Sequence, residues 1–142
     1  MEARVSILPE RHLTHDVLGP QKVSAIHERF TADSEIGAVV SFAGVVRADR
    51  HEAGTVEAIE FTAQETIAEA QIRSLVERLT ADTPGDRVMV HIEHRLGTVP
   101  VGEAPIVIVV GNGHRREGFA LCSAILEALK SEVPIYGKEI LD

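Results

Sequence analysis

The sequence contains little of several residue types on which common functional sites depend. It has one cysteine in 142 residues, so no intrachain disulfide can form and a cysteine-rich zinc site is excluded. It has no tryptophan and only 4% aromatic residues, which argues against a surface on which nucleobases stack. Lys and Arg number 14 against 22 for Asp and Glu, giving a formal net charge of −8. Because binding to nucleic-acid phosphates favours a basic protein, we expect no nucleic-acid partner.

Long apolar runs are also missing. No apolar run reaches the roughly 18 residues that a membrane-spanning helix needs, so we expect no membrane association. The chain carries charge from Glu2 onward, and its start lacks the apolar core of a signal peptide. The length fits one domain over residues 1–142, and we expect a cytoplasmic protein.

The spacing of apolar residues predicts both helices and strands. A helical period predicts helices over residues 20–30, 64–79 and 115–131. Alternating or β-branched apolar runs predict strands over residues 1–8, 36–46, 55–62, 87–94 and 105–111, with a short strand pair or extended arm over 133–140. Strands that come both in pairs and separated by helices indicate an α+β fold, with a mixed or antiparallel sheet and helices packed on it.

Turn chemistry predicts how these elements connect. We expect residues 36–46 and 55–62 to pair as a hairpin around a long charged loop. Residues 83–85, which read Thr-Pro-Gly, are expected to be a connection. Residues 95–103 contain two glycines and a proline and are expected to be a turn region.

The seven histidines raise the question of a metal site. His91 and His94 lie three residues apart on a predicted strand, where such positions point to opposite faces, so they do not easily share one ion. The sequence has neither an HExxH motif nor a cluster of cysteine and histidine, and we expect no metal ion. Cys122 falls on the apolar stripe of the last predicted helix, which favours a buried thiol over a nucleophile.

Five cationic or titratable side chains lie near the ends of predicted elements: Arg47, His114, Arg115, Lys130 and Lys138. The first turn of a helix attracts anions, so a histidine and an arginine at such a start favour an anionic ligand over ordinary solvated charge. If these ends converge, they form a local cationic pocket suited to a small phosphorylated or carboxylated ligand.

Several stretches in one order resemble the MoaE family, the catalytic (large) subunit of molybdopterin synthase. They are the run GAVVSFAGVVR over 37–47, His94-Arg-Leu-Gly97, Val101-Gly-Glu103, His114-Arg115 with Phe119, Leu129-Lys130, and Val133-Pro-Ile-Tyr136 followed by Lys138-Glu139.

The resemblance implies a MoaE-like fold of the α/β hammerhead type and a homodimer. Each large subunit of the family binds a small ubiquitin-like (MoaD-type) subunit, giving a heterotetramer. The Gly-Gly tail of that sulfur-carrier subunit bears a thiocarboxylate. Two sulfurs pass from such tails to cyclic pyranopterin monophosphate, which becomes the dithiolene of molybdopterin in molybdenum cofactor biosynthesis. No permanently bound cofactor is implied.

The resemblance also implies roles for particular residues. Lys130 and Lys138 are expected to be catalytic, by stabilising negative charge or by transferring a proton. Substrate-binding roles are implied for Phe42, Val46, Arg47, His114, Arg115 and Glu139.

One position separates two hypotheses about function. Gly137 stands where the family has a lysine, and Lys138 follows it. The alternative to an active sulfurtransferase is therefore a MoaE-related binding or assembly protein with weakened or lost catalysis. An unrelated anion-binding domain is a third hypothesis.

Overall fold

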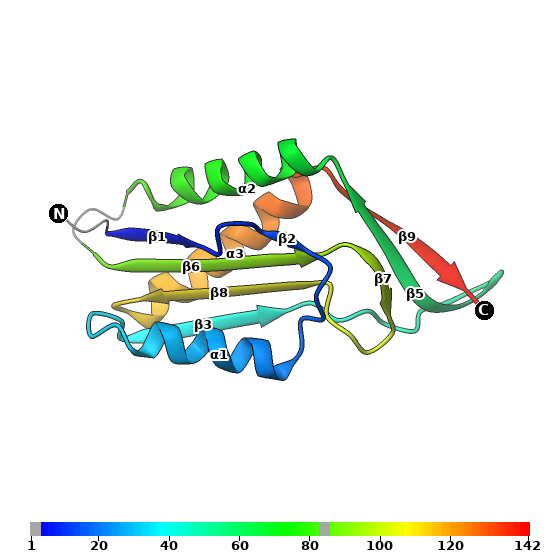
Figure 1. The fold of residues 1–142 in the computed structure, drawn as a ribbon, viewed down its shortest axis with the longest axis horizontal. Coiled ribbons are helices and arrows are strands. Elements are labelled where there is room, and N and C mark those ends of the chain that lie inside the picture. Colours follow the sequence, from blue (N-terminus) through cyan, green and yellow to red (C-terminus); the bar gives the residue numbers. More distant parts are fainter. Residues whose placement is uncertain (1–3, 83–85) are drawn as a thin grey trace.

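The computed structural model describes residues 4–82 and 86–142 and has two sheets (Figure 1). The main sheet has the strand order β1-β6-β8-β3, with the short β2 also paired to β6. β8 runs antiparallel to both of its neighbours, whereas β1 and β2 run parallel to β6, so the sheet is mixed as predicted. The bounds of its strands are Val5–Leu8 (β1), Leu13–Thr14 (β2), Ala38–Ala43 (β3), Val88–Arg95 (β6) and Ile106–Asn112 (β8).

The second sheet is built around one long strand at the end of the molecule that carries the C-terminus (Figure 1). β5 pairs in antiparallel fashion with β4, β7 and β9. The bounds are Arg50–His51 (β4), Gly54–Ala63 (β5), Gly97–Pro100 (β7) and Ile135–Leu141 (β9). The sequence from 133 onward therefore contributes one strand to this sheet and not a strand pair of its own.

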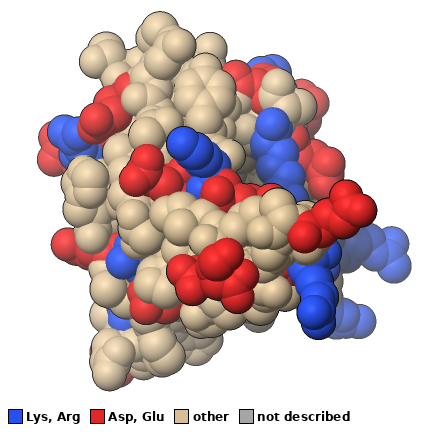
Figure 2. All heavy atoms as spheres, turned by 90° about the vertical axis from the view of Figure 1, so that its right-hand side faces the viewer, with Lys and Arg blue, Asp and Glu red and all other residues tan. Residues whose placement is uncertain are grey.

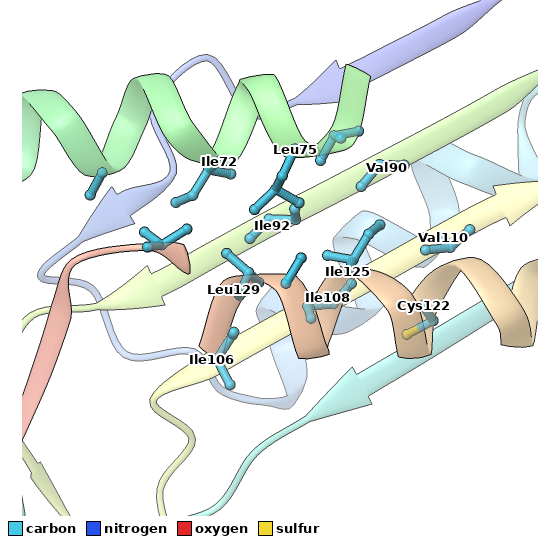
Figure 3. Close-up of a cluster of buried hydrophobic side chains, with 14 of the residues drawn as sticks. Ile72, Leu75, Val90, Ile92, Ile106, Ile108, Val110, Cys122, Ile125 and Leu129 are labelled. Atoms are coloured by element: carbon cyan, nitrogen blue, oxygen red, sulfur yellow. The ribbon is translucent and has the colours of Figure 1, made fainter. Parts of the chain in front are cut away.

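Three helices cover the main sheet. α2 (Glu65–Thr80) and α3 (Arg115–Glu132) pack on one face, and α1 (Pro20–Thr31) packs on the other. Figure 3 shows the larger core, where α2 and α3 meet alternate residues of β6 and β8. The residues in between, such as Met89 and Val107, face α1. Because the two central strands are buried on both faces, β8 reads as a nearly continuous apolar run, whereas β6 also buries the polar side chains of His91 and Glu93.

The predicted hairpin between residues 36–46 and 55–62 is wrong. β3 pairs with β8 in the main sheet, and β5 belongs to the second sheet. After β3 the chain stays hydrogen-bonded to the start of β8 and to the segment before it, since Gly44 N–H donates to the Ile106 carbonyl and Val46 N–H to the Glu103 carbonyl. The long connection thereby carries the chain from one sheet to the other.

The expected turn region over residues 95–103 also contains a strand. Gly97 has φ of +89°, a left-handed conformation that favours glycine, and it redirects the chain from β6 into β7. The predicted connection at 83–85 lies outside the described residues. Among the described helices, none combines the length and apolar character needed to cross a membrane.

Candidate functional site

A cavity of about 320 Å³ lies where the last turn of α3 meets both sheets. We call it the Lys130 pocket. Its walls are mostly apolar, and among the described residues that line it only Lys130 and His94 are titratable. The complete lining is Phe42, Gly44, Val45, Phe61, His94, Pro105, Ile106, Leu126, Leu129, Lys130 and Ile135.

Lys130 is held at this position by the end of α3. Its neighbour Leu129 is buried in the core shown in Figure 3, and Val133 N–H donates to the Leu129 carbonyl as the helix ends. Val133 is extended, and Pro134 follows it, so the chain leaves the helix and enters β9. A cation in the last turn is favoured by the helix dipole. Lys130 itself is exposed, so its ammonium group is available to a ligand.

Phe42, a predicted substrate-binding residue, lies in the same pocket. Val45 also lines it and is 57% exposed, which leaves an apolar rim at the pocket. Val46 does not line it. Val46 is 3% exposed and packs with Val56 and Val99 in a small core on the second sheet.

Positions 137 and 138 lie on opposite faces of β9. Gly137 is paired with Phe61 and Lys138 with Glu60, and cross-strand partners share a face. Since Phe61 lines the Lys130 pocket, Gly137 lies on the pocket face and Lys138 on the other. Gly137 is not among the described residues with positive φ, and β9 continues through it to Leu141. The structure therefore does not bring the Lys138 side chain to the side of the sheet on which Lys130 lies.

The other predicted residues near this end are on the surface. The Arg47 side chain is 81% exposed and its Nε lies 3.3 Å from Asp49 Oδ1. Glu139 shares the β9 face of Gly137, and its Oε1 lies 3.1 Å from His51 Nε2. Figure 2 views this end and shows acidic and basic side chains interspersed, with the basic ones densest toward one edge. There is no continuous basic face here.

His114 and Arg115 line a second, more open cavity at the start of α3, of about 690 Å³. His114 is the N-cap residue in an extended conformation, and its side chain makes no capping bond. Gly37 approaches this turn so closely that a Cβ atom there would lie 2.5 Å from the Gly113 carbonyl oxygen. Arg115 and Lys130 lie in the first and last turns of α3, separated by a helical rise of about 22 Å. One chain therefore does not bring these cations together.

His94 is the site residue that reasoning from the sequence left without a role. It lies on the α3 face of β6, whereas His91 lies on the α1 face beside Glu93, so the prediction that the two histidines point apart is confirmed. The His94 ring meets the Phe61 ring edge-on, with centroids 5.0 Å apart. The sequence pointed to His94 only through its place in the His-Arg-Leu-Gly stretch. Its contact with the pocket could not be predicted, because that contact depends on how the two sheets meet.

Burial decides the state of one other reactive group. Cys122 is 6% exposed within the α3 core, and burial raises the pKa of its thiol, which agrees with the predicted structural role. Among residues 4–82 and 86–142, no group of three or more His, Cys, Asp or Glu side chains has the arrangement to hold a metal ion.

Comparisons with known proteins identify the family to which this chain belongs. The MoaE protein family model matches residues 14–132, and the chain belongs to this family. Catalytic subunit 1 of molybdopterin synthase from Aedes aegypti is 36% identical over 127 residues, which cover 89% of this chain and 78% of the relative.

Solved structures agree at the level of the fold. Molybdopterin synthase from Staphylococcus aureus superposes with a TM-score of 0.79 at 24% identity, covering 95% of this chain and 93% of that one. A complex of subunits 1 and 2 of the molybdopterin-converting factor from Helicobacter pylori contains a chain with a TM-score of 0.70 at 17% identity, covering 98% of this chain and 86% of that one.

Proposed function

We propose that this chain is the large, catalytic subunit of a molybdopterin synthase. It transfers sulfur from the thiocarboxylated C-terminus of a small ubiquitin-like subunit to cyclic pyranopterin monophosphate, and so makes the dithiolene of molybdopterin. The observation that carries the proposal is Lys130 in a mostly apolar pocket, in a chain that belongs to the MoaE family. The Helicobacter pylori structure, a complex of two subunits, supports a small protein partner. We place the reaction in the cytoplasm.

Lys130 suits this chemistry because it is the only fixed positive charge among the pocket's lining residues. A thiocarboxylate brings negative charge, and attack at its acyl carbon places more of it on oxygen. An ammonium group at the wall of a largely apolar cavity stabilises that charge more than it would in bulk water. A Gly-Gly tail has no side chains, so it fits a narrow cavity.

We further propose that a second copy of the chain completes the site. Within one chain, about 22 Å of helix separates Lys130 from the predicted substrate residue Arg115. Between them, the α3 face and the edge strand β3 form an apolar groove that includes Val40 and Phe119, and Phe119 is 62% exposed. A two-fold homodimer through this groove sets the start of one α3 beside the end of the other.

In this proposal Lys138 contributes less to catalysis than Lys130. It lies on the face of β9 away from Phe61, so Lys130 carries the chemistry expected of the pair. The alternative, a binding or assembly protein with weak catalysis, predicts that Gly137→Lys raises the rate. An active sulfurtransferase that relies on Lys130 predicts no gain.

The test is reconstitution of sulfur transfer. The chain is mixed with cyclic pyranopterin monophosphate and either the thiocarboxylated small subunit or the same subunit with an ordinary carboxylate. We expect dithiolene product only with the thiocarboxylate. Tight binding of the small subunit without product, while a known synthase works in parallel, would support the binding-protein alternative instead.

A further inference from the structure

His94 lines the Lys130 pocket, and one of its two ring nitrogens already makes a hydrogen bond within the protein. Its Nδ1 lies 2.9 Å from the Arg95 carbonyl oxygen. A carbonyl only accepts hydrogen bonds, so Nδ1 carries the proton and donates it. The neutral ring then has an unprotonated Nε2, which is a hydrogen-bond acceptor and a base.

Nε2 is free to act on a ligand. Within the described residues it has no hydrogen-bond partner, and it is not among the buried polar atoms sealed from solvent. The ring is held on one side by the edge contact with Phe61. Phe61 in turn packs on Gly137, where a Cβ atom would lie 3.0 Å from its Cε1. The absence of a side chain at 137 thus lets Phe61 support the histidine.

The surroundings keep His94 neutral. Burial lowers the pKa of its imidazole, and the bond to the Arg95 carbonyl opposes this effect only in part. The pocket side chains contributed by β3, β5, β8 and β9 are uncharged, and the one charged side chain lining it is Lys130 on α3.

We infer that His94 is the general base of the proposed reaction, accepting at Nε2 the proton of the water that releases the small subunit. The inference rests on the proposed function. When sulfur passes to the pterin, the bond between that sulfur and the acyl carbon of the tail must break. The sulfur keeps the bonding electron pair and stays on the pterin. The acyl carbon gains a hydroxyl group from water, and the first water proton goes to His94 Nε2. The carboxylic acid formed in this way loses the second proton to solvent and leaves as the carboxylate.

The roles of the two pocket groups are complementary. Lys130 stabilises the negative charge that develops on the acyl oxygen as water adds. A base with a pKa near the working pH accelerates such a step by about 10²–10⁴-fold. The neutral imidazole of His94 has a lone pair on Nε2 that can accept this proton, whereas the Lys130 ammonium group has none.

The test compares His94→Asn with the native protein in single-turnover transfer from the thiocarboxylated small subunit. Asparagine keeps an N–H donor for the Arg95 carbonyl but has no basic nitrogen. We expect product formation to fall about 100-fold or more, with unchanged affinity for the small subunit. The native rate should decline at acid pH through a pKa below the ordinary histidine value of about 6.5, and this decline should vanish in the variant.

Two controls keep the outcomes distinct. His27→Asn removes an exposed histidine of α1 and should leave the rate and its pH dependence unchanged. His94→Gln repeats the test if the asparagine variant does not fold. Native rates and an unchanged pH profile in a folded His94 variant overturn the role of His94 and leave the proposed function standing. No product from the native protein itself overturns the proposed function, and the role of His94 with it.

Discussion

Phe61 and Gly137 lie directly opposite each other on β5 and β9, and a Cβ atom at 137 would come within 3.0 Å of the Phe61 ring and of Ile59 Cγ2. Position 137, where the resemblance to the MoaE family predicts a lysine, has no side chain in this protein, and the Phe61 ring packs against it. This contact ties the second sheet to the pocket, since Phe61 also meets His94.

The Phe61–Gly137 contact predicts a stability change. Gly137→Ala forces Phe61 and Ile59 to shift, and overpacking of this kind lowers the free energy of unfolding by about 1 kcal/mol. Gly113→Ala is the matched control, because a Cβ atom there has no described neighbour within 4 Å. Urea denaturation of both variants measures the difference. Equal stability of the two variants would show that the contact is not tight.

A buried ionic network on the other face of β6 predicts a pH effect. Glu93 is 5% exposed and lies 2.9 Å from Lys22 Nζ and 2.8 Å from His91 Nε2. Burial alone would raise the pKa of Glu93, but the hydrogen bonds to His91 and Lys22 outweigh it and the pKa is lowered. A lowered carboxyl pKa adds stability above the unfolded-state pKa, and this stability is lost as pH falls.

Glu93→Gln should therefore destabilise the protein by about 2 kcal/mol at pH 7, because Lys22 loses its buried counter-ion. The gap to the native protein should narrow as the pH falls below about 4.5, because the Glu93 carboxylate is protonated first in the unfolded state and only at lower pH in the folded state. Glu132→Gln, at an exposed pair with Arg78, is the control and should cost about 0.5 kcal/mol or less. A Glu93 effect that is the same at pH 7 and pH 4 would contradict this account.

The proposed homodimer predicts complementation between inactive variants. If one α3 supplies Arg115 and the other supplies Lys130 to a shared site, Arg115→Ala and Lys130→Ala dimers are each inactive. After random subunit exchange, about a quarter of the sites contain both native residues, and activity should return to about that fraction. Mixtures that stay as inactive as the separate variants would place both residues in the same subunit's site, or would rule out the dimer.

The sequence predicted individual helices and strands better than it predicted which distant segments pair or pack together. All three helices are confirmed, because their apolar stripes match the helical period and face the sheet. The predicted hairpin was wrong because pattern alone favours neighbours in sequence, while β3 found its partner in β8. β7 was not predicted, because a four-residue strand that begins with a glycine and ends with a proline has little strand signal of its own. It is a strand because it pairs with β5.

The same distinction applies to the site. Lys130 and Phe42 share one pocket, but Val46 is buried elsewhere and His114 and Arg115 lie at the far end of α3. Positions 137 and 138 face apart because β9 is extended through both of them. That His94 lies beside Lys130 depends on the junction of two sheets, which no local pattern encodes.

The most direct test of the account compares the chain's two lysines that were predicted to be catalytic. Lys130→Ala and Lys138→Ala remove the same charge from places on opposite sides of the β5–β9 strand pair. Single-turnover dithiolene formation with the thiocarboxylated small subunit should fall about 100-fold or more in Lys130→Ala and by less than about threefold in Lys138→Ala. Full activity of Lys130→Ala, or a larger loss in Lys138→Ala, would contradict the assignment of sulfur transfer to the Lys130 pocket.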